Sequence, residues 1–165
     1  MSTYVVGVDG SKGSVEALRY AIEEARVHDA TVKAVSAWHT PAILYESGWA
    51  PLPVDYGAYP KQAQEVLDRC LEEVGAAESG VEVTTVVHQG QAADVICEEA
   101  KGADLLIVGS RGVGGFRGLL LGSVSQQCAH FAPCPILIVP NRTSLKEHED
   151  LVGERSEKVA GAPPV

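Results

Sequence analysis

The sequence has too few basic residues to bind nucleic acid or an anionic membrane through its overall charge. Its 165 residues include 13 Lys and Arg against 22 Asp and Glu, which gives a net charge of −9 at pH 7. Binding to a phosphate backbone relies on clustered Lys and Arg. We therefore expect no nucleic acid and no membrane among the partners. The deficit still allows one local anion site, because such a site needs only a few backbone N–H groups and one or two cations.

Long hydrophobic runs and paired cysteines are also missing. No apolar run approaches the roughly 18 residues that a membrane helix needs. Residues 1–7 lack the basic region and the cleavage site of a signal peptide. The four cysteines, Cys70, Cys97, Cys128 and Cys134, form no C-x-x-C pair, and we interpret them as buried structural thiols. These absences predict a cytoplasmic, reducing setting.

Several motifs of catalysis are absent. The five histidines do not have the spacing of metal ligands, and no H-E-x-x-H motif occurs. The sequence contains neither the G-x-S-x-G elbow of a serine hydrolase nor the G-x4-G-K-[ST] loop whose lysine contacts nucleotide phosphates. No general base or nucleophile is therefore identified.

Most of the chain alternates between apolar runs, typical of buried strands, and segments of helical period. Strands are expected at residues 3–8, 31–38, 81–87, 104–109 and 135–140. Helices are expected from an N-cap at Ser11 or Ser14 to about His28, over 61–74, near 93–100, and from Ser123 to Pro133. This pattern predicts a single-domain α/β fold: a doubly wound, five-stranded parallel sheet with helices on both faces, in a Rossmann-like arrangement.

The predicted domain covers residues 1–140. Within it, residues 39–60 carry several prolines and aromatics without a clear period, and we interpret them as an inserted lid or packing loop. Residues 141–165 mix charges with Gly161 and two prolines and show no sustained period. They are predicted to be a flexible, charged C-terminal tail.

The most informative stretch is the glycine-rich loop from Gly109 to Ser123, which joins a predicted strand to a predicted helix. Such a loop presents unpaired backbone N–H groups, and the helix dipole favours an anion beside them. Arg111 and Arg117 lie inside the loop. A second turn of small residues, 7–11, follows the first strand. Both lie at the carboxyl ends of parallel strands, so they should converge on one ligand crevice.

The glycine spacing resembles a known signature. Gly109, Gly112, Gly122 and Ser123 match G-x2-G-x9-G-[S/T], the ATP-binding signature of the universal stress protein family. The matching segments 5–11, 103–110 and 134–140 extend the resemblance over residues 3–140. It implies an adenine nucleotide α-hydrolase-like fold that binds ATP, with a divalent cation, Mg²⁺ or Mn²⁺, on the phosphates.

The resemblance also implies roles for individual residues. Asp9 would bond the ribose, Gly7 and Val8 would line the base side, and the main chain of Ala37 would contact adenine. Residues along the ribose and phosphates would be Gly109, Ser110, Arg111 and Gly112. Residues around the triphosphate would be Gly122, Ser123, Val124 and Ser125. From sequence alone, Asp9 could also simply cap a turn. Likewise, one of the serines Ser123 and Ser125 could be the N-cap of the helix, and the other could have no role in binding.

The family resemblance leaves three functions open. The first is a regulatory or stress-response protein that binds ATP, with slow hydrolysis at most. The second is an ATP-using enzyme such as a pyrophosphatase, but its S-G-G-x-D-S loop is poorly matched by residues 10–14. The third is a protein-interaction module of the same fold that binds cyclic AMP or no ligand. Members of this family commonly dimerise through their last strands, so a homodimer through residues 136–139 is expected.

Overall fold

The computed structural model describes residues 1–39, 57–112 and 121–140, and it confirms the predicted α/β fold. Most of the proposed insert, the tail and the centre of the glycine loop, including Arg117, lie outside these residues. The elements are, in chain order, β1 (Thr3–Gly7), α1 (Lys12–His28), β2 (Thr31–Trp38), α2 (Ala58–Glu73), the 3₁₀ turn η1 (Ala76–Glu78), β3 (Val83–Gln89), α3 (Ala92–Glu99), β4 (Leu105–Gly109), α4 (Ser123–Phe131) and β5 (Ile136–Val139).

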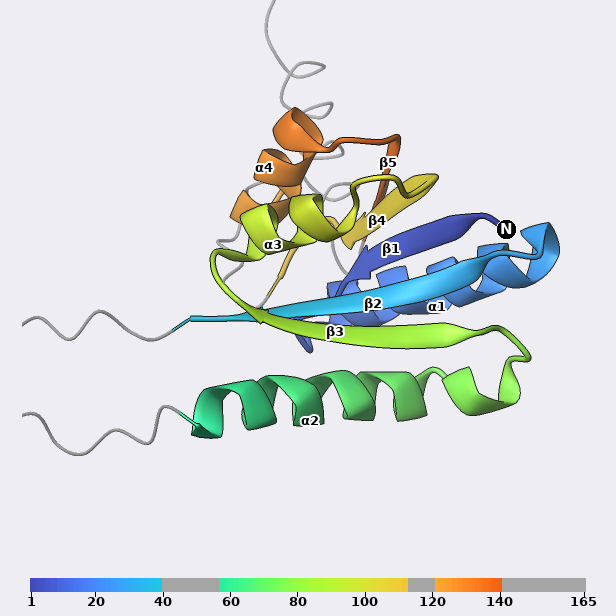
Figure 1. The fold of residues 1–165 in the computed structure, drawn as a ribbon, viewed down its shortest axis with the longest axis horizontal. Coiled ribbons are helices and arrows are strands. Elements are labelled where there is room, and N and C mark those ends of the chain that lie inside the picture. The colour runs from blue at the N-terminus through green and yellow to red at the C-terminus, as the bar shows by residue number, and fades with distance from the viewer. Residues whose placement is uncertain (40–56, 113–120, 141–165) are drawn as a thin grey trace, which may run out of the picture.

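The strands form one parallel sheet in the order β3-β2-β1-β4-β5 (Figure 1). The first strand is therefore central, and the last strand lies at an edge, as the sequence predicts. Val6 of β1 is in register with Ala34 of β2 and with Ile107 of β4. Since β1 and β4 are neighbours, the turns that follow them leave the sheet side by side at its carboxyl edge.

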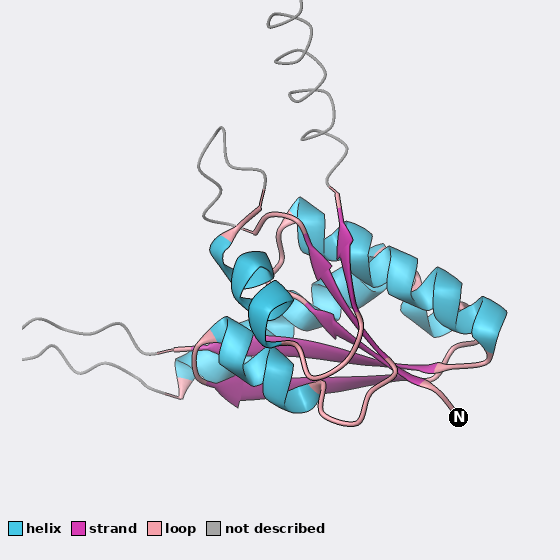
Figure 2. Ribbon diagram, turned by 90° about the horizontal axis from the view of Figure 1, so that it is seen from above, coloured by secondary structure: helices cyan, strands magenta, loops and turns pink. Residues whose placement is uncertain are grey.

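Helices cover both faces of the sheet (Figures 1 and 2). On one face, α1 and α2 pack against side chains such as Val6 and Ile107. On the other, α3 and α4 pack against Val5 and Leu106. Adjacent strand residues thus point into different cores, and both cores are apolar. This explains why the strands appear in the sequence as continuous apolar runs rather than as alternating patterns.

Two elements have predicted boundaries that are wrong by two or three residues. The second helix begins at Ala58 instead of Lys61, which places Pro60 in the first turn, where no intrahelical N–H bond is lost. The third strand covers Val83–Gln89 instead of residues 81–87, because it pairs with β2 as far as Trp38 and Gln89.

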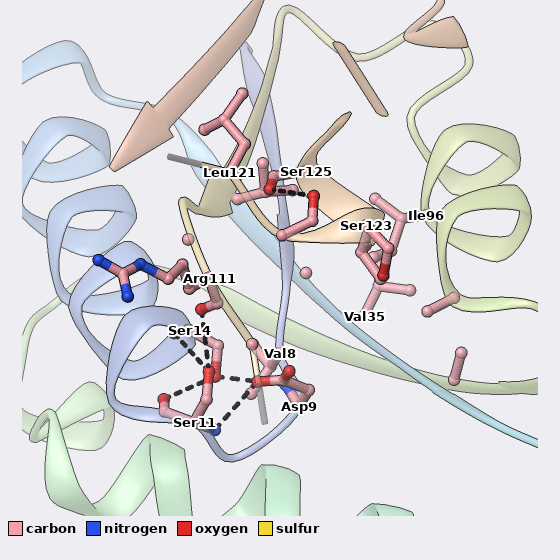
Figure 3. A pocket seen from close by; sticks show the side chains of 18 residues that line it. Val8, Asp9, Ser11, Ser14, Val35, Ile96, Arg111, Leu121, Ser123 and Ser125 are labelled. Atoms are coloured by element: carbon pink, nitrogen blue, oxygen red, sulfur yellow. Dashed lines mark hydrogen bonds between the residues drawn. The ribbon is translucent and has the colours of Figure 1, made fainter. Parts of the chain in front are cut away.

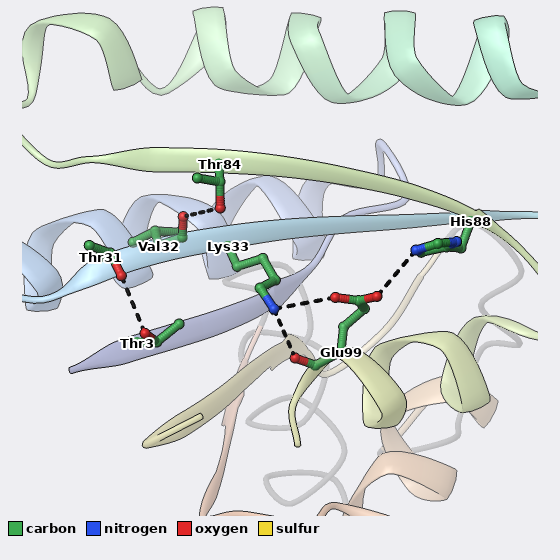
Figure 4. Close-up of polar contacts among 7 residues, drawn as sticks. All are labelled: Thr3, Thr31, Val32, Lys33, Thr84, His88 and Glu99. Atoms are coloured by element: carbon green, nitrogen blue, oxygen red, sulfur yellow. Dashed lines mark hydrogen bonds and ion pairs between the residues drawn. The ribbon is translucent and has the colours of Figure 1, made fainter. Parts of the chain in front are cut away.

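Side-chain contacts hold the ends of two helices to the sheet or to its strands. Glu99 is the last residue of α3. Its Oε2 atom forms an ion pair with Lys33 Nζ of β2 at 3.3 Å, and its Oε1 atom lies 3.2 Å from His88 Nε2 of β3 (Figure 4). These contacts hold the C-terminal end of α3 to the sheet. Trp38, at the end of β2, stacks on Tyr59 in the first turn of α2, with ring centroids 6.2 Å apart.

Candidate functional site

A pocket of about 350 Å³ opens at the carboxyl edge of the sheet, between the turns after β1 and β4 and the first turn of α4 (Figure 3). Its volume lies within the range of small-molecule sites. Eleven of the twelve residues predicted to bind the nucleotide line it: Gly7, Val8, Asp9, Ala37, Gly109, Arg111, Gly112, Gly122, Ser123, Val124 and Ser125. The two turns therefore converge on one crevice, as the topology of the sequence predicts.

The turn between β1 and α1 is closed by its own hydrogen bonds. Asp9 Oδ1 accepts from the Ser11 N–H at 3.0 Å, and the Asp9 N–H donates to Ser14 Oγ at 3.3 Å. Ser11 is the N-cap of α1, and its Oγ accepts from the Ser14 N–H at 3.2 Å. Asp9 thus stabilises the turn while its exposed carboxylate also lines the pocket. The turn-capping role and the ligand-facing position coexist in one residue.

The end of β4 lies directly against the start of α1. A Cβ added at Gly109 would lie 2.6 Å from both the carbonyl carbon and the carbonyl oxygen of Gly13, and 3.0 Å from the Ser14 nitrogen. Only glycine permits this approach between two backbones. Gly109 therefore serves helix–strand packing, in addition to lining the pocket.

Glycine at position 112 brings the β4 loop close to Asp9. A Cβ at Gly112 would collide with the Asp9 Oδ2 atom. The Ser11 hydroxyl reaches the carbonyl of Arg111 at 3.5 Å. The two turns are thus in direct contact at the pocket, with a carboxylate from one turn beside the bare backbone of the other.

The N-terminus of α4 is open towards the pocket. Its N-cap is Gly122, and among the described residues no side chain caps the helix. The first intrahelical bond runs from the Gln126 N–H to the Gly122 carbonyl at 2.9 Å. The first-turn N–H groups of Ser123, Val124 and Ser125 have no acceptor within the helix itself. Together with the positive end of the helix dipole, they provide a place for an anion.

Ser110 and Ser125 have structural roles that the sequence does not reveal. Both are buried, and Ser110 is the one predicted site residue that does not line the pocket. The Ser110 carbonyl accepts from the Gly122 N–H at 2.7 Å and from Ser125 Oγ at 2.9 Å. Ser125 Oγ also lies 2.9 Å from the Gly122 carbonyl. The Ser125 hydroxyl therefore joins the two ends of the loop instead of pointing its proton at a ligand (Figure 3).

The sequence reasoning missed several apolar residues of the pocket wall. Val35 lies two residues before Ala37 on β2, so the period of a strand could have found it. Ile96 of α3 packs on Gly7, where a Cβ would come within 2.7 Å of the Ile96 Cδ1 atom. No motif indicates that contact, because it depends on how α3 crosses the sheet. The missed lining residues are Ser11, Ser14, Val35, Ala92, Ile96, Val108 and Leu121.

Within the described residues, no group of three or more His, Cys, Asp or Glu side chains could hold a metal ion. The same residues contain no helix that combines the length and apolarity required to cross a membrane.

Fold and site together define a doubly wound α/β domain with a glycine-lined pocket at the carboxyl edge of its sheet. The model of the universal stress protein family matches residues 1–140. The chain belongs to the universal stress protein family.

Known relatives agree with this assignment. The universal stress protein YxiE of Bacillus subtilis is 31% identical over 144 residues, which cover 82% of this chain and 96% of YxiE. The universal stress protein Rv2623 of Mycobacterium tuberculosis is 34% identical over 134 residues, covering 81% of this chain and 43% of Rv2623. The chain thus matches less than half the length of that mycobacterial relative.

Solved structures share the fold. A universal stress protein in complex with cAMP superimposes with a TM-score of 0.63 at 26% sequence identity, over 84% of this chain and 96% of that one. The doubly wound fold is therefore shared with a solved universal stress protein.

Proposed function

We propose that the pocket binds an adenine nucleotide, with the phosphates at the N-terminus of α4 and the base on the apolar wall. The observation that carries this proposal is the open first turn of α4 beside the glycine-lined loop. Uncapped N–H groups and the helix dipole favour phosphate oxygens. The apolar part of the pocket wall, which includes Val35, Ala37 and Ile96, is suited to a flat, largely apolar base.

The relative solved with cAMP supports the adenine class of ligand. The complete G-x2-G-x9-G-[S/T] signature supports ATP as the ligand, with Mg²⁺ or Mn²⁺ bound through its phosphates. Gly122 and the first turn of α4 would hold the phosphates, and Asp9 would bond the ribose. Since no base or nucleophile is identified, we infer a regulatory or stress-response binding protein in the cytoplasm, with slow ATP hydrolysis at most. Binding of cyclic AMP or of no nucleotide is the alternative.

The test is to identify and measure the bound nucleotide. Mass spectrometry of the small molecules released when purified protein is denatured should give ATP; ADP or AMP would instead indicate hydrolysis, and cyclic AMP would support the alternative. Calorimetric titrations with ATP and Mg²⁺, AMP and cyclic AMP give the affinities. No released nucleotide and no binding of any of the three would refute the proposal.

The substitution Gly122→Val tests whether the phosphates of the nucleotide lie at the N-terminus of α4. The backbone of Gly122 is extended, with φ −75° and ψ 164°, and an added Cβ meets only ordinary contacts at 3.4 Å or more. The substitution should therefore preserve the fold while its methyl groups occupy the phosphate space, and affinity should fall at least tenfold.

Ala129→Val is the matched control, because Ala129 is an exposed residue later in α4 and does not line the pocket. It should bind as the wild type does. Gly122→Ala adds a single methyl group and keeps the test available if the valine variant unfolds. Wild-type affinity in a folded Gly122→Val protein would show that the phosphates lie elsewhere.

We further infer that the protein is a homodimer through β5. The carbonyls of Pro135 and Val139 accept from the Leu106 and Ser110 N–H groups. By the alternation of a parallel strand, the backbone of Ile138 then points away from β4, towards the open edge. Such an edge favours pairing with a second strand.

The mass in solution tests the dimer. Sedimentation should give a mass twice the 17.4 kDa of the single chain. Ile138→Pro removes one outward N–H without removing a bond to β4, so it should shift the protein to monomers. A wild-type protein that sediments as a monomer would refute this inference and leave the pocket unaffected.

A further inference from the structure

The helix α3 forms part of the pocket wall, although it is short and buries little apolar surface. It has eight residues, Ala92–Glu99, and isolated helices shorter than about 12–15 residues are marginal in water. Its buried residues are Ala93 and Ile96, and of these only Ile96 has a large apolar side chain. Ile96 also lines the pocket. The position of this wall therefore depends on the other contacts that hold α3 to the sheet.

Polar contacts tie both ends of α3 to β2. Just before α3, the Gly90 N–H donates to the carbonyl of Trp38 at 2.9 Å. At the other end, Lys33 Nζ donates to the main-chain carbonyl of Glu99 and to Glu99 Oε2, each at 3.3 Å (Figure 4). The carbonyl groups in the last turn of a helix have no partner within the helix, and a positive charge beside them is favourable. Lys33 therefore satisfies both the backbone and the side chain at the C-terminal end of α3.

Lys33 lies on the same face of β2 as the pocket wall. Successive side chains of a strand alternate between its two faces, so Lys33, Val35 and Ala37 point the same way. Val35 and Ala37 line the pocket from β2, and Ile96 lines it from α3. Glu99 follows Ile96 by three residues, which is about one helical turn. The contact between Lys33 and Glu99 therefore fixes the spacing of β2 and α3 next to the two walls that they contribute.

The contact of Glu99 with Lys33 is more sheltered than the other ion pairs at this end of α3. The side chains of Lys33 and Glu99 are 30% and 21% exposed. His88 of β3 is 59% exposed, and its contact with Glu99 is an ion pair only when the imidazole is protonated. Glu98 pairs with Lys101, and these side chains are 69% and 64% exposed. Exposed pairs of this kind contribute about 0–1 kcal/mol, so Lys33 is expected to provide most of the attachment.

We propose that Glu99 is a positioning residue for nucleotide binding: through Lys33, it sets the spacing of α3 and β2 and thereby the width of the part of the pocket that holds the base. This inference rests on the proposed function, in which the apolar wall holds the base and the N-terminus of α4 holds the phosphates. Glu99 does not line the pocket, so it acts on the ligand only through α3. Loss of the contact lets α3 move away from β2, while the first turn of α4 keeps its place.

Glu99→Gln is the first test, because it keeps the size of the side chain and removes its charge. Calorimetry on the full-length protein measures the affinities for ATP with Mg²⁺ and for adenosine, which carries the base without phosphates. Both affinities should fall about fivefold, a factor that corresponds to about 1 kcal/mol. Competition by inorganic triphosphate, which has no base, should not change. Unchanged affinities, a loss for ATP without a loss for adenosine, or an equal loss for triphosphate would each overturn the proposal.

Glu98→Gln is the matched control. It makes the same chemical change one residue earlier in α3, in the exposed pair with Lys101. This variant should bind ATP and adenosine as the wild type does. A loss equal to that of Glu99→Gln would mean that any charge change at the end of α3 has the effect, and it would overturn the role of Glu99.

Substitutions of Lys33 test whether the two side chains act as one unit. Lys33→Met keeps most of the alkyl stem without the ammonium group and should also lower both affinities about fivefold, whereas Lys33→Arg should retain them. The double variant Lys33→Met, Glu99→Gln should again lose about fivefold, because both changes break one contact. A loss of about 25-fold, the product of two independent effects, would overturn the proposal.

Hydrogen exchange distinguishes a local movement from a general loss of structure. In Glu99→Gln, the amides of residues 92–99 should exchange faster, while those of α4 should exchange as in the wild type. If Glu99→Gln does not fold, as judged by circular dichroism, Lys33→Met and Lys33→Arg provide the same comparison. A wild-type protein that binds no nucleotide would refute the proposed function and this inference with it. A wild type that binds and a Glu99→Gln variant that binds equally well would refute this inference alone.

Discussion

The turns after β1 and β4 are alike in composition, but the helices that follow them differ in how their N-termini are capped. Both follow adjacent central strands, and both contain glycine and serine. After β1, the Ser11 side chain caps α1 and accepts the Ser14 N–H. After β4, Gly122 leaves α4 without a side-chain cap among the described residues. At the N-terminus of α1, a side chain of the adjoining turn accepts a hydrogen bond from a first-turn N–H group. The N-terminus of α4 faces the pocket instead.

The comparison shows that a small-residue loop at a strand end does not by itself define an anion site. The β1 turn supplies a carboxylate and a rigid frame, and the β4 turn supplies backbone donors. Gly109 and Gly13 join the two, because their backbones touch. The pocket therefore depends on one closed turn supporting one open turn.

The largest effect should come from breaking the contact between the turns. Gly109→Ala would place a Cβ 2.6 Å from the backbone of Gly13, and neither backbone can move without displacing β4 or α1. Overpacking of this kind costs about 3 kcal/mol of unfolding free energy. Urea denaturation measures the loss. A variant with wild-type stability would mean that the approach of β4 to α1 is looser than described.

A smaller effect should distinguish the closed helix end from the open one. Ser11→Ala removes the N-cap of α1 and should cost about 1 kcal/mol of unfolding free energy. Ser123→Ala removes an exposed hydroxyl at the start of α4 and should change stability by less than about 0.5 kcal/mol. Paired denaturation curves provide the measurement. Equal losses in the two variants would contradict the difference between the two turns.

The order of the elements could be predicted well from the sequence, and their exact ends less well. The apolar runs identify β1, β2, β4 and β5 within a residue or so, because strands covered on both faces need apolar side chains throughout. The edge strand β3 has exposed polar residues such as Thr85 and His88, so its pattern is weaker. Its limits follow from pairing with β2, and register is not visible in one sequence.

The residues of the candidate site likewise fall into those that the sequence predicts and those that it does not. Backbone positions that a motif specifies, such as Gly112 and Gly122, lie at the pocket as predicted. Residues that reach the pocket by tertiary packing, such as Ile96, were not found. The role of Ser125 also escaped prediction, since a serine after a glycine signature could serve a ligand or the loop, and only the geometry shows the bond to Ser110.

The stack of Trp38 on Tyr59 has a consequence for how this domain tolerates variation in length. The two rings hold the chain together where it leaves β2 and where it enters α2. When the two ends of a loop are already held together, doubling the length of the loop costs only about 0.6 kcal/mol. Segments of other lengths, or a grafted peptide, should be accepted between these aromatics without repacking the sheet. The position is a natural point for insertion in protein engineering.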